Sequence, residues 1–390
     1  MTQPRQFRNV RTLGLVQSEI RRMTRECERV CGINLGQGVC DLPTPPPVRD
    51  GVIAAVSAGR STYSKFEGVD ELRSAIAAKA RSYNRLERVD PATDVVVTVG
   101  ATGAFVCAVH ALFNPGDEIL VFEPYYGYHV HILEVAGLTP VFVPMQAPHW
   151  TFSPDDLERA ITPRTRGIIV NTPANPSGKV FSQAELQVLA DCCCRHDLLA
   201  LTDEIYEYIV YDGHRHLSLA ALPGMWERTV TISGFSKTFS VTGWRLGYAI
   251  APAALAGPIG LLNDVYYICA PTPLQHGVAE GMGKLGPDYY TAMAADYQRK
   301  RDRLCDALAA AGLPPLVPDG AYYTLADVSR LGCPDARTAA MLLLERTGVA
   351  AVAGSAFFTD GQGENLLRFC YAKDWAMLDE ACRRLAAGRV

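Results

Sequence analysis

The sequence predicts an α/β fold: a largely parallel sheet with helices on both faces, joined to a smaller α+β domain. Two observations carry this prediction. Between residues 94 and 250, short runs rich in valine, isoleucine and leucine alternate with segments of helical pattern. Beyond about residue 281 the pattern changes to long, charged helical segments with few apolar runs. A chain of 390 residues is also too long for one simple core, so two domains are expected.

The first ninety residues are expected to be mostly helical. Residues 1–32 have apolar positions at roughly helical spacing and read as an amphipathic arm (Leu13, Leu15, Val16, Ile20, Met23). A stretch rich in glycine and proline follows over 33–48, and it suits a domain linker as well as a loop whose glycines let backbone amides approach a ligand. Helices are then expected over 48–58 and 70–83.

Strands and helices alternate through the middle of the chain. Strands are expected over 95–99, 119–122, 140–143, 167–170, 198–202, 230–232 and 246–250, and the last is a candidate for antiparallel orientation. Helices are expected over 103–113, over 128–136, from residue 153 and over 182–196. The last of these begins with Ser182 and Glu185 at the spacing of a capping box.

The C-terminal part is expected to hold helices over 289–311 and 336–347, short strands at 316–317, 321–325 and 365–370, and a final helix. These elements predict three regions. Residues 1–45 form an arm and part of the small domain, residues 46–285 the large domain, and residues 286–390 the small C-terminal domain.

Composition narrows the classes of partner. The net charge is −4, from 37 basic and 41 acidic residues, which argues against nucleic acid or an anionic membrane as the main partner. The twelve cysteines include no C-x-x-C pair of a metal site, so free thiols in a reducing cytoplasm and no metal are expected. The first thirty residues lack the apolar core of a secretory signal, which also favours a cytoplasmic location.

The segment Ser233–Tyr248 carries one lysine and one arginine among small and hydroxylated residues. Lys237 follows the apolar run 230–232, and it is the one lysine of seven that follows a buried strand at this edge of the sheet. A desolvated lysine can attack an aldehyde, and Arg245 offers a planar fork for a phosphate. Pyridoxal 5′-phosphate (PLP) has both groups. A surface turn with two cations is the alternative, and for the lysine alone it is the commoner outcome.

Other polar residues stand where neighbouring strands end. Residues 100–104 open a helix after the strand 95–99 and form a candidate anion site, although many such turns bind nothing. Tyr126 could stack on a flat ring or pack in the core, and Asn175 could donate to a ring hydroxyl or close an Asx turn. Asp203 follows a buried strand and needs a cationic partner, which a pyridinium or a structural ion pair would supply. Tyr206 is placed to bind a phenolic oxygen.

The motifs S-K-T-F-S-V-T-G-W-R-L-G-Y, N-P-S-G and D-E-I-Y make nearly the whole chain resemble the fold-type I, class I/II PLP-dependent aminotransferases. The resemblance implies a seven-stranded, mostly parallel sheet and a homodimer. It matches Lys237 to the Schiff-base lysine and general acid/base, and Asp203 to the partner of the pyridine nitrogen. The remaining matches are contacts to the ring oxygen (Tyr206, Asn175), the stacking aromatic (Tyr126), the phosphate cup (Ala101, Thr102, Ser236, Arg245), a tyrosine reaching the neighbouring subunit's phosphate (Tyr63), and contacts to the substrate carboxylate (Arg368, Gly38, with Asn175 beside them).

Within this family the chain resembles the kynurenine, glutamine and methionine aminotransferases, with the aspartate branch also similar. It departs from them at Cys40, where proline is usual, and at Lys65, Phe66 and Glu67, near the expected substrate mouth. Gly234 replaces a phosphate-binding serine, so Ser236 or Ser233 must serve.

The resemblance implies ping-pong transfer of an amino group from an L-amino acid to a 2-oxo acid. A carbon–sulfur β-lyase or an amino-acid oxidase or cyclase of the same fold is the alternative, and a regulatory protein with a retired site is a more distant one. The donor, the acceptor, the pathway and the role of residues 65–67 in specificity stay open.

Overall fold

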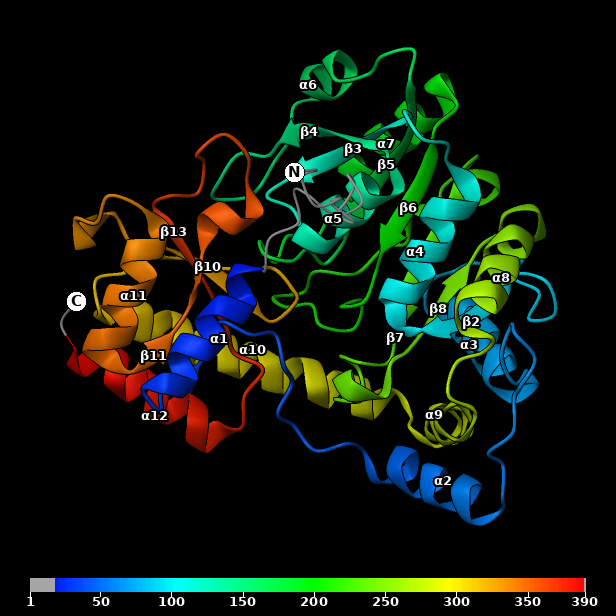
Figure 1. Ribbon diagram of the computed structural model, residues 1–390, viewed down its shortest axis with the longest axis horizontal. Helices are drawn as coiled ribbons and strands as arrows, with labels where there is room; N and C mark the ends of the chain where they lie inside the picture. Colours follow the sequence, from blue (N-terminus) through cyan, green and yellow to red (C-terminus); the bar gives the residue numbers. More distant parts are fainter. Residues whose placement is uncertain (1–17, 389–390) are drawn as a thin grey trace, which may run out of the picture.

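A seven-stranded sheet forms the centre of the larger part of the protein (Figure 1). The computed structural model describes residues 18–388. The strand order is β2 (Val95–Val99), β8 (Leu246–Ile250), β7 (Thr229–Gly234), β6 (Leu199–Asp203), β5 (Thr165–Asn171), β3 (Glu118–Glu123) and β4 (Thr139–Pro144). Strand β8 runs antiparallel to both neighbours and the other pairs are parallel, which confirms the expected orientation.

Helices cover both faces of this sheet, because successive side chains of each buried strand enter opposite cores. Ile169 packs with α4 (Gly100–Leu112), α5 (Gly127–Ala136) and α8 (Ala253–Tyr267). Its neighbours Ile168 and Val170 pack with α6 (Pro154–Arg159) and α7 (Gln183–His196). A further core lies under α2 (Pro46–Ser57), α3 (Asp70–Ser82) and α9 (Thr272–Lys284).

The second part is built on a four-stranded antiparallel sheet of β12 (Val352–Ala353), β13 (Leu366–Cys370), β10 (Tyr323–Asp327) and β9 (Pro315–Leu316). Its helices are α10 (Pro287–Ala310), α11 (Ala336–Thr347) and α12 (Trp375–Ala387). The N-terminal segment joins the same core. Helix α1 (Glu19–Arg29) buries Met23 and Cys27 there, and β1 (Ile33–Asn34) pairs with β11 (Val349–Ala350).

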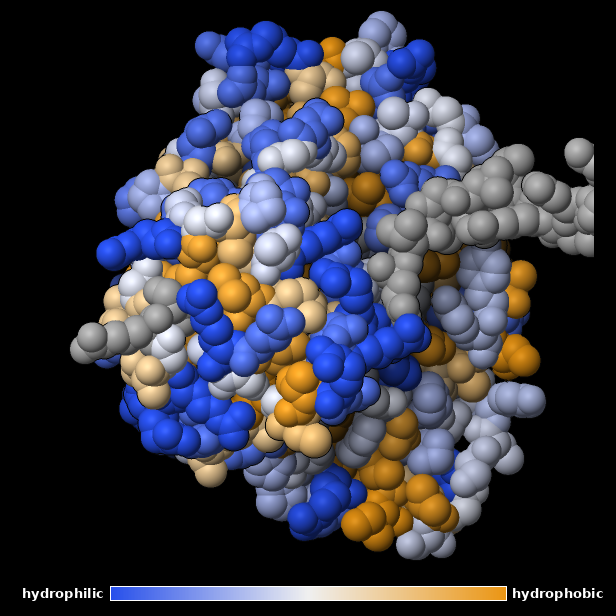
Figure 2. Space-filling model, turned by 60° about the vertical axis from the view of Figure 1, so that its left-hand side comes forward, coloured by the Kyte–Doolittle hydropathy of each residue, from blue (hydrophilic) through white to orange (hydrophobic). Residues whose placement is uncertain are grey.

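Figure 2 brings the C-terminal side of the molecule forward. Hydrophilic residues cover most of this face, and the hydrophobic ones gather in smaller patches between them. Helix α12 shows the cause, because Leu378, Ala381, Cys382 and Leu385 are buried while its charged residues face outward. Within residues 18–388, no helix combines the length and hydrophobicity needed to cross a membrane.

Most expected elements occur close to the expected bounds, and the capping box of Ser182 and Glu185 is present. Helices α8 and α9 were not expected, and neither were the two-residue strands β1, β11 and β12. The strand expected at 321–325 lies two residues later, as β10. Leu13, Leu15 and Val16 of the expected arm lie outside the described residues. All twelve cysteines are free, and eight of them are buried, as expected.

Candidate active site

The carboxyl ends of the central strands bring several of the predicted residues to one edge of the large sheet. Asn171 at the end of β5 pairs with Asp203 at the end of β6, and Asp203 pairs with Ile232 of β7. A cavity of about 230 Å³ opens at this edge. Eleven of the twelve predicted site residues line it: Gly38, Ala101, Thr102, Tyr126, Asn175, Asp203, Tyr206, Ser236, Lys237, Arg245 and Arg368.

Lys237 differs from every other lysine in having no carboxylate partner among residues 18–388. The other six form salt bridges, namely Lys65–Asp70, Lys79–Glu207, Lys179–Glu185, Lys284–Glu280, Lys300–Asp296 and Lys373–Asp41. The Lys237 Nζ donates to the carbonyl oxygen of Gly38 at 3.3 Å and lies 5.9 Å from the ring centre of Tyr206. Burial lowers the pKa of its ammonium to about 8, so a neutral, nucleophilic amine is within reach near physiological pH.

The N-terminus of α4 lies against Arg245 at the cavity, an arrangement that suits an anion and is called the cradle below. The first turn of α4 has no side-chain cap, so its backbone N–H groups remain available. Gly100, at φ +72°, begins the helix, and a Cβ there would lie 2.5 Å from Nη2 of Arg245. Only glycine therefore lets the guanidinium approach the turn this closely. Arg245 itself has φ +54°, a conformation that side chains adopt at a cost.

Of the two serines considered for the same cradle, Ser236 lines the cavity. Ser233 instead donates to the carbonyl oxygen of Glu204 and to the Glu207 carboxylate. A Cβ at Gly234 would lie 3.0 Å from the Gly247 backbone and 3.2 Å from Ile205, so a serine there would have to displace its neighbours. Ser236 is therefore the serine that the geometry favours.

Asp203 is buried at the end of β6, without an arginine or lysine beside it among residues 18–388. Its Oδ2 lies 3.0 Å from Nε2 of His129, and its Oδ1 accepts from the backbone N–H of Ile205. The ring of Tyr126 stands edge-on to His129, with centroids 5.2 Å apart. Burial raises the pKa of Tyr126 and of Tyr206, so both are neutral hydrogen-bonding groups.

Arg368 is 1% exposed and has only neutral hydrogen-bond acceptors. Its Nη1 donates to Oδ1 of Asn175 at 2.9 Å, and its Nη2 donates to the carbonyl oxygen of Gly36 at 2.6 Å. Its Nε is buried without a partner in the described part of the chain. A buried cation without a carboxylate is costly unless an anion completes it, so this end of the cavity suits a ligand carboxylate.

Gly38 lies beside this end, and the position has no room for a side chain. Its carbonyl oxygen accepts from Lys237 and from the hydroxyl of Tyr322, and a Cβ there would lie 1.8 Å from Oη of Tyr323. Of the two functions considered for the stretch 33–48, Gly38 lines the cavity, whereas Pro46 and Pro47 begin helix α2.

Tyr63 is the predicted residue that does not line the cavity of its own chain. It is 78% exposed. The nearby Lys65 pairs with Asp70, Phe66 lies against Gly260, and Glu67 accepts from the Val97 backbone through its carbonyl oxygen. Residues 65–67 therefore do not border the cavity within one chain.

Sequence reasoning missed several residues that line the cavity, among them His129, Asn171, Tyr323, Phe105 and Arg21. His129 had a weak signal, because it lies three positions after Tyr126, on one face of the helix. Asn171 Nδ2 donates to the carbonyl oxygen of Asp203, and its Oδ1 accepts from the backbone of Asn175. Asn171 stands where a strand ends, so the sequence pointed to it as strongly as it pointed to Asn175.

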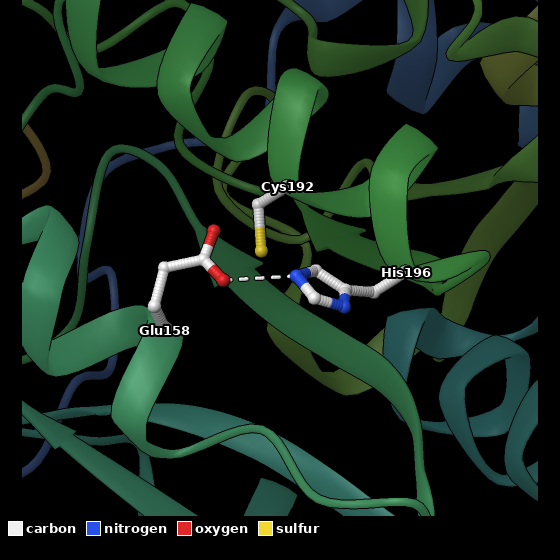
Figure 3. A group of neighbouring side chains, drawn as sticks. All are labelled: Glu158, Cys192 and His196. Carbon is white, nitrogen blue, oxygen red and sulfur yellow. Dashed lines mark hydrogen bonds and ion pairs between the residues drawn. The ribbon is translucent and has the colours of Figure 1, made fainter.

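Two other groups of ligand-type side chains belong to the framework. Glu158 of α6 points toward Cys192 and His196 of α7, as Figure 3 shows. His196 contacts one oxygen of Glu158 at 2.9 Å and Arg195 pairs with the other, so the group ties the two helices together.

The second group is Glu204, Glu207 and His216, buried behind the D-E-I-Y segment. Each carboxylate already accepts several hydrogen bonds. Glu204 accepts from Thr202, Ser218 and His216, and Glu207 accepts from Lys79, Asn84 and Ser233.

Comparisons with known proteins agree with this geometry. The family model described as aminotransferase class I and II matches residues 31–385. Kynurenine–oxoglutarate transaminase 3 of Rattus norvegicus is 36% identical, covering 96% of this chain and 89% of that protein. The probable N-succinyldiaminopimelate aminotransferase of Mycobacterium tuberculosis is also 36% identical, covering 93% of this chain and 94% of its own length.

Solved structures extend the likeness to three dimensions. N-succinyldiaminopimelate aminotransferase from Mycobacterium tuberculosis superposes with a TM-score of 0.94 at 36% identity, covering 98% of this chain and all of that one. Escherichia coli YbdL, described as having a methionine aminotransferase function, superposes with a TM-score of 0.93 at 32% identity, with the same coverage.

Proposed function

From the premise that the chain belongs to the class I and II aminotransferase family and is a PLP-dependent enzyme of fold type I, we propose that it moves an amino group from an L-amino acid to a 2-oxo acid by a ping-pong mechanism centred on Lys237. When bound, the cofactor supplies an aldehyde that carries the amino group and a ring that accepts electrons from the substrate α-carbon. The relatives reported above are aminotransferases, so they do not favour a lyase, oxidase or cyclase.

The residues of the cavity would divide the work. The α4 turn, Ser236 and Arg245 would hold the phosphate, and Tyr126 would lie against the ring. Asp203, oriented by His129 at 3.0 Å, would keep the ring nitrogen protonated. Tyr206 and Asn175 would hold the ring oxygen.

Two cations, Arg368 and Lys237, would act on the substrate. Arg368 would bind the α-carboxylate through its fork, with Gly38 on the other side. Lys237 would first hold the cofactor and then, released by the substrate amine, take the proton from the α-carbon and return it to the cofactor. Its pKa of about 8 suits both duties, because a base works best when its pKa lies near the working pH.

The observation that carries this proposal is the pairing of the lysines. Six of the seven lysine amines are held by carboxylates, and the seventh lines the same cavity as the α4 turn, Arg245 and the buried carboxylate of Asp203. No other lysine has the free amine that PLP chemistry needs.

The test is the visible absorbance of the purified protein, before and after a panel of amino acids is added without an acceptor. The proposal predicts a yellow bound cofactor that some donors convert to the pyridoxamine form. Lys237→Ala is expected to lose turnover by at least about 10²–10⁴-fold, while the matched control Lys284→Ala, an exposed lysine paired with Glu280, keeps it. Full turnover in Lys237→Ala, or pyruvate and ammonia formed without an acceptor, would contradict the proposal.

We further propose a cytoplasmic homodimer in which Tyr63 reaches the phosphate of the neighbouring active site. The exposure of Tyr63 supports this, as do the apolar side chains exposed on α2 and α8. The regions 1–45, 46–285 and 286–390 remain our proposed domain division. Helix α10 would join the two larger regions, because Tyr290 packs with the large-sheet core and Tyr297 with the small-sheet core.

A further inference from the structure

Three side chains of the kind that bind metal ions meet outside the active-site cavity, between α6 and α7. Cys192 and His196 lie one turn apart on α7, so they share a face of that helix. Glu158 comes from α6 and points toward both of them (Figure 3). Their ligand atoms all lie within 4.8 Å of one another, and none of the three residues lines the cavity. We propose that these three side chains bind one zinc ion, which joins the two helices.

The spacing of the ligand atoms suits a tetrahedral ion after small rotations of the side chains. Zinc binds sulfur at about 2.3 Å and nitrogen or oxygen at about 2.0–2.2 Å, so its tetrahedral ligand atoms stand about 3.4–3.6 Å apart. Nε2 of His196 and Oε2 of Glu158 are 2.9 Å apart, and this pair would widen to admit the ion. A sulfur ligand beside nitrogen and oxygen favours zinc over magnesium or calcium.

The group has an open side through which an ion can enter. Cys192 is 2% exposed and its thiol is free. The side chains of His196 and Glu158 are 29% and 39% exposed, so an ion would pass them from solvent and meet the sulfur at the inner end. With three protein ligands, the fourth position of a tetrahedral ion would hold water on this open side.

The charges of the group balance those of the ion. Burial and the nearby carboxylate of Glu158 raise the pKa of the Cys192 thiol to about 11, so the ion must displace the thiol proton, which passes to solvent. The thiolate and the carboxylate then carry two negative charges and the imidazole none, which neutralises Zn²⁺. Arg195 contacts Oε1 of Glu158 and leaves Oε2 to the ion, as an outer partner that orients a ligand carboxylate does.

The spacing of cysteines in the sequence does not indicate this site. The expected absence of a metal concerned C-x-x-C pairs, whereas this group joins a C-x-x-x-H segment of one helix to a glutamate of another. The third ligand therefore depends on how α6 packs against α7, which a local motif does not record.

The test is a titration of the purified protein with Co²⁺, which occupies tetrahedral zinc sites and gives a charge-transfer band when a thiolate binds it. Difference spectra against the metal-free protein should show this band saturating at one equivalent per chain. Cys192→Ser should lose the band, and calorimetry should find its affinity for Zn²⁺ at least tenfold lower. His196→Gln changes a partly exposed side chain and should weaken Zn²⁺ binding by a similar factor.

Cys194→Ser is the matched control, because Cys194 is an exposed free thiol on the same helix but outside the group. It should keep the cobalt band and change the Zn²⁺ affinity less than twofold. A wild-type protein without the band, or a band that persists in Cys192→Ser, would overturn the site. Equal losses in Cys192→Ser and Cys194→Ser would show an adventitious ion only. A wild-type protein that transfers no amino group would contradict the proposed function and leave the zinc site intact.

Discussion

At the scale of single residues, partners distinguish Lys237 more clearly than burial does. Lys179, Lys300 and Lys373 are each less than 5% exposed, yet each forms a salt bridge with a carboxylate. Lys237 has a backbone carbonyl and two aromatic rings instead. Burial without a counter-charge favours the neutral amine, and this explains the direction of its pKa shift.

The lowered pKa of Lys237 predicts how cofactor uptake depends on pH. Because the neutral amine is the nucleophile, the rate at which cofactor-free protein takes up PLP should rise about tenfold per pH unit below pH 8 and level off above it. A free lysine analogue, with an ordinary pKa of about 10.4, should keep rising beyond pH 9. Stopped-flow absorbance measures both, and a protein whose rate still climbs steeply above pH 9 would contradict the shift.

The lowered pKa of Lys237 also predicts how the stability of the cofactor-free protein depends on pH. The folded pKa lies below the unfolded value of 10.5, so between about pH 8 and 10.5 the unfolded chain binds more protons than the folded one. Lys237 should therefore destabilise the cofactor-free protein below pH 8, and the penalty should fade as the pH rises through this window. Denaturant unfolding of wild type and Lys237→Met at pH 7 and 9 compares the two states, and the difference between them should shrink at pH 9.

At the scale of elements, the parallel sheet explains which site residues could be predicted. Asn175, Asp203 and Lys237 follow the ends of neighbouring strands, and all such ends meet at one edge. Arg368 comes from the middle of β13 in another sheet, so no local pattern pointed to it and only the family resemblance did. His129 and Tyr323 depend on how α5 and β10 are turned toward the edge, which tertiary packing decides.

The turn before α4 gives a prediction about glycine. Gly100→Ala adds a methyl group at φ +72° and 2.5 Å from Arg245, whereas Gly59→Ala adds one at φ +71° in open space. Both should lose about 1–2 kcal/mol of unfolding free energy to the left-handed conformation. Only Gly100→Ala should also weaken PLP binding, by displacing the guanidinium. Thermal unfolding and cofactor titration measure the two effects, and equal PLP affinity in the two variants would argue against the cradle.

Behind the active site, a salt bridge between Lys79 of α3 and Glu207 joins this helix to the segment that follows β6. Burial alone would raise the pKa of Glu207, but Lys79 and His216 outweigh it, so the pKa is lowered. Lys79→Met should cost about 3–5 kcal/mol of unfolding free energy, because it leaves a buried carboxylate unpaired. The double variant Lys79→Met, Glu207→Gln should lose less than the two single losses added together. Additive losses in a denaturant series would show that the pair is not coupled.

Because the folded pKa of Glu207 is depressed, the pair stabilises the protein above the ordinary value of 4.5, and this contribution disappears as the pH falls through the folded pKa. The double variant should accordingly lose less stability than wild type between pH 5 and pH 3. Unfolding measured by circular dichroism across this range checks the sign.

At the scale of the whole molecule, exposed apolar side chains on α8 indicate a covered surface. Leu261 is 62% exposed, Val265 75% and Tyr266 45%. Val265→Asp should dissociate the proposed dimer and lower activity, since each site would lose the partner's Tyr63. Val317→Asp is the control, because Val317 is 58% exposed but lies in the C-terminal part. Light scattering after gel filtration gives the masses, and an intact dimer in Val265→Asp would place the interface elsewhere.

The pairing of the seven lysines also bears on which amine of the protein reacts with aldehydes in general. Reducing sugars, lipid aldehydes and surplus cofactor all modify amines in their uncharged form, and burial favours that form at Lys237. Most of the basic residues are the thirty arginines, which do not form stable imines, and among residues 18–388 Lys237 is the one lysine without a carboxylate partner. Selectivity among the lysines thus rests on the burial of one unpaired amine, before any aldehyde arrives. Borohydride reduction followed by peptide mapping should accordingly find one dominant labelled peptide, the one that contains Lys237.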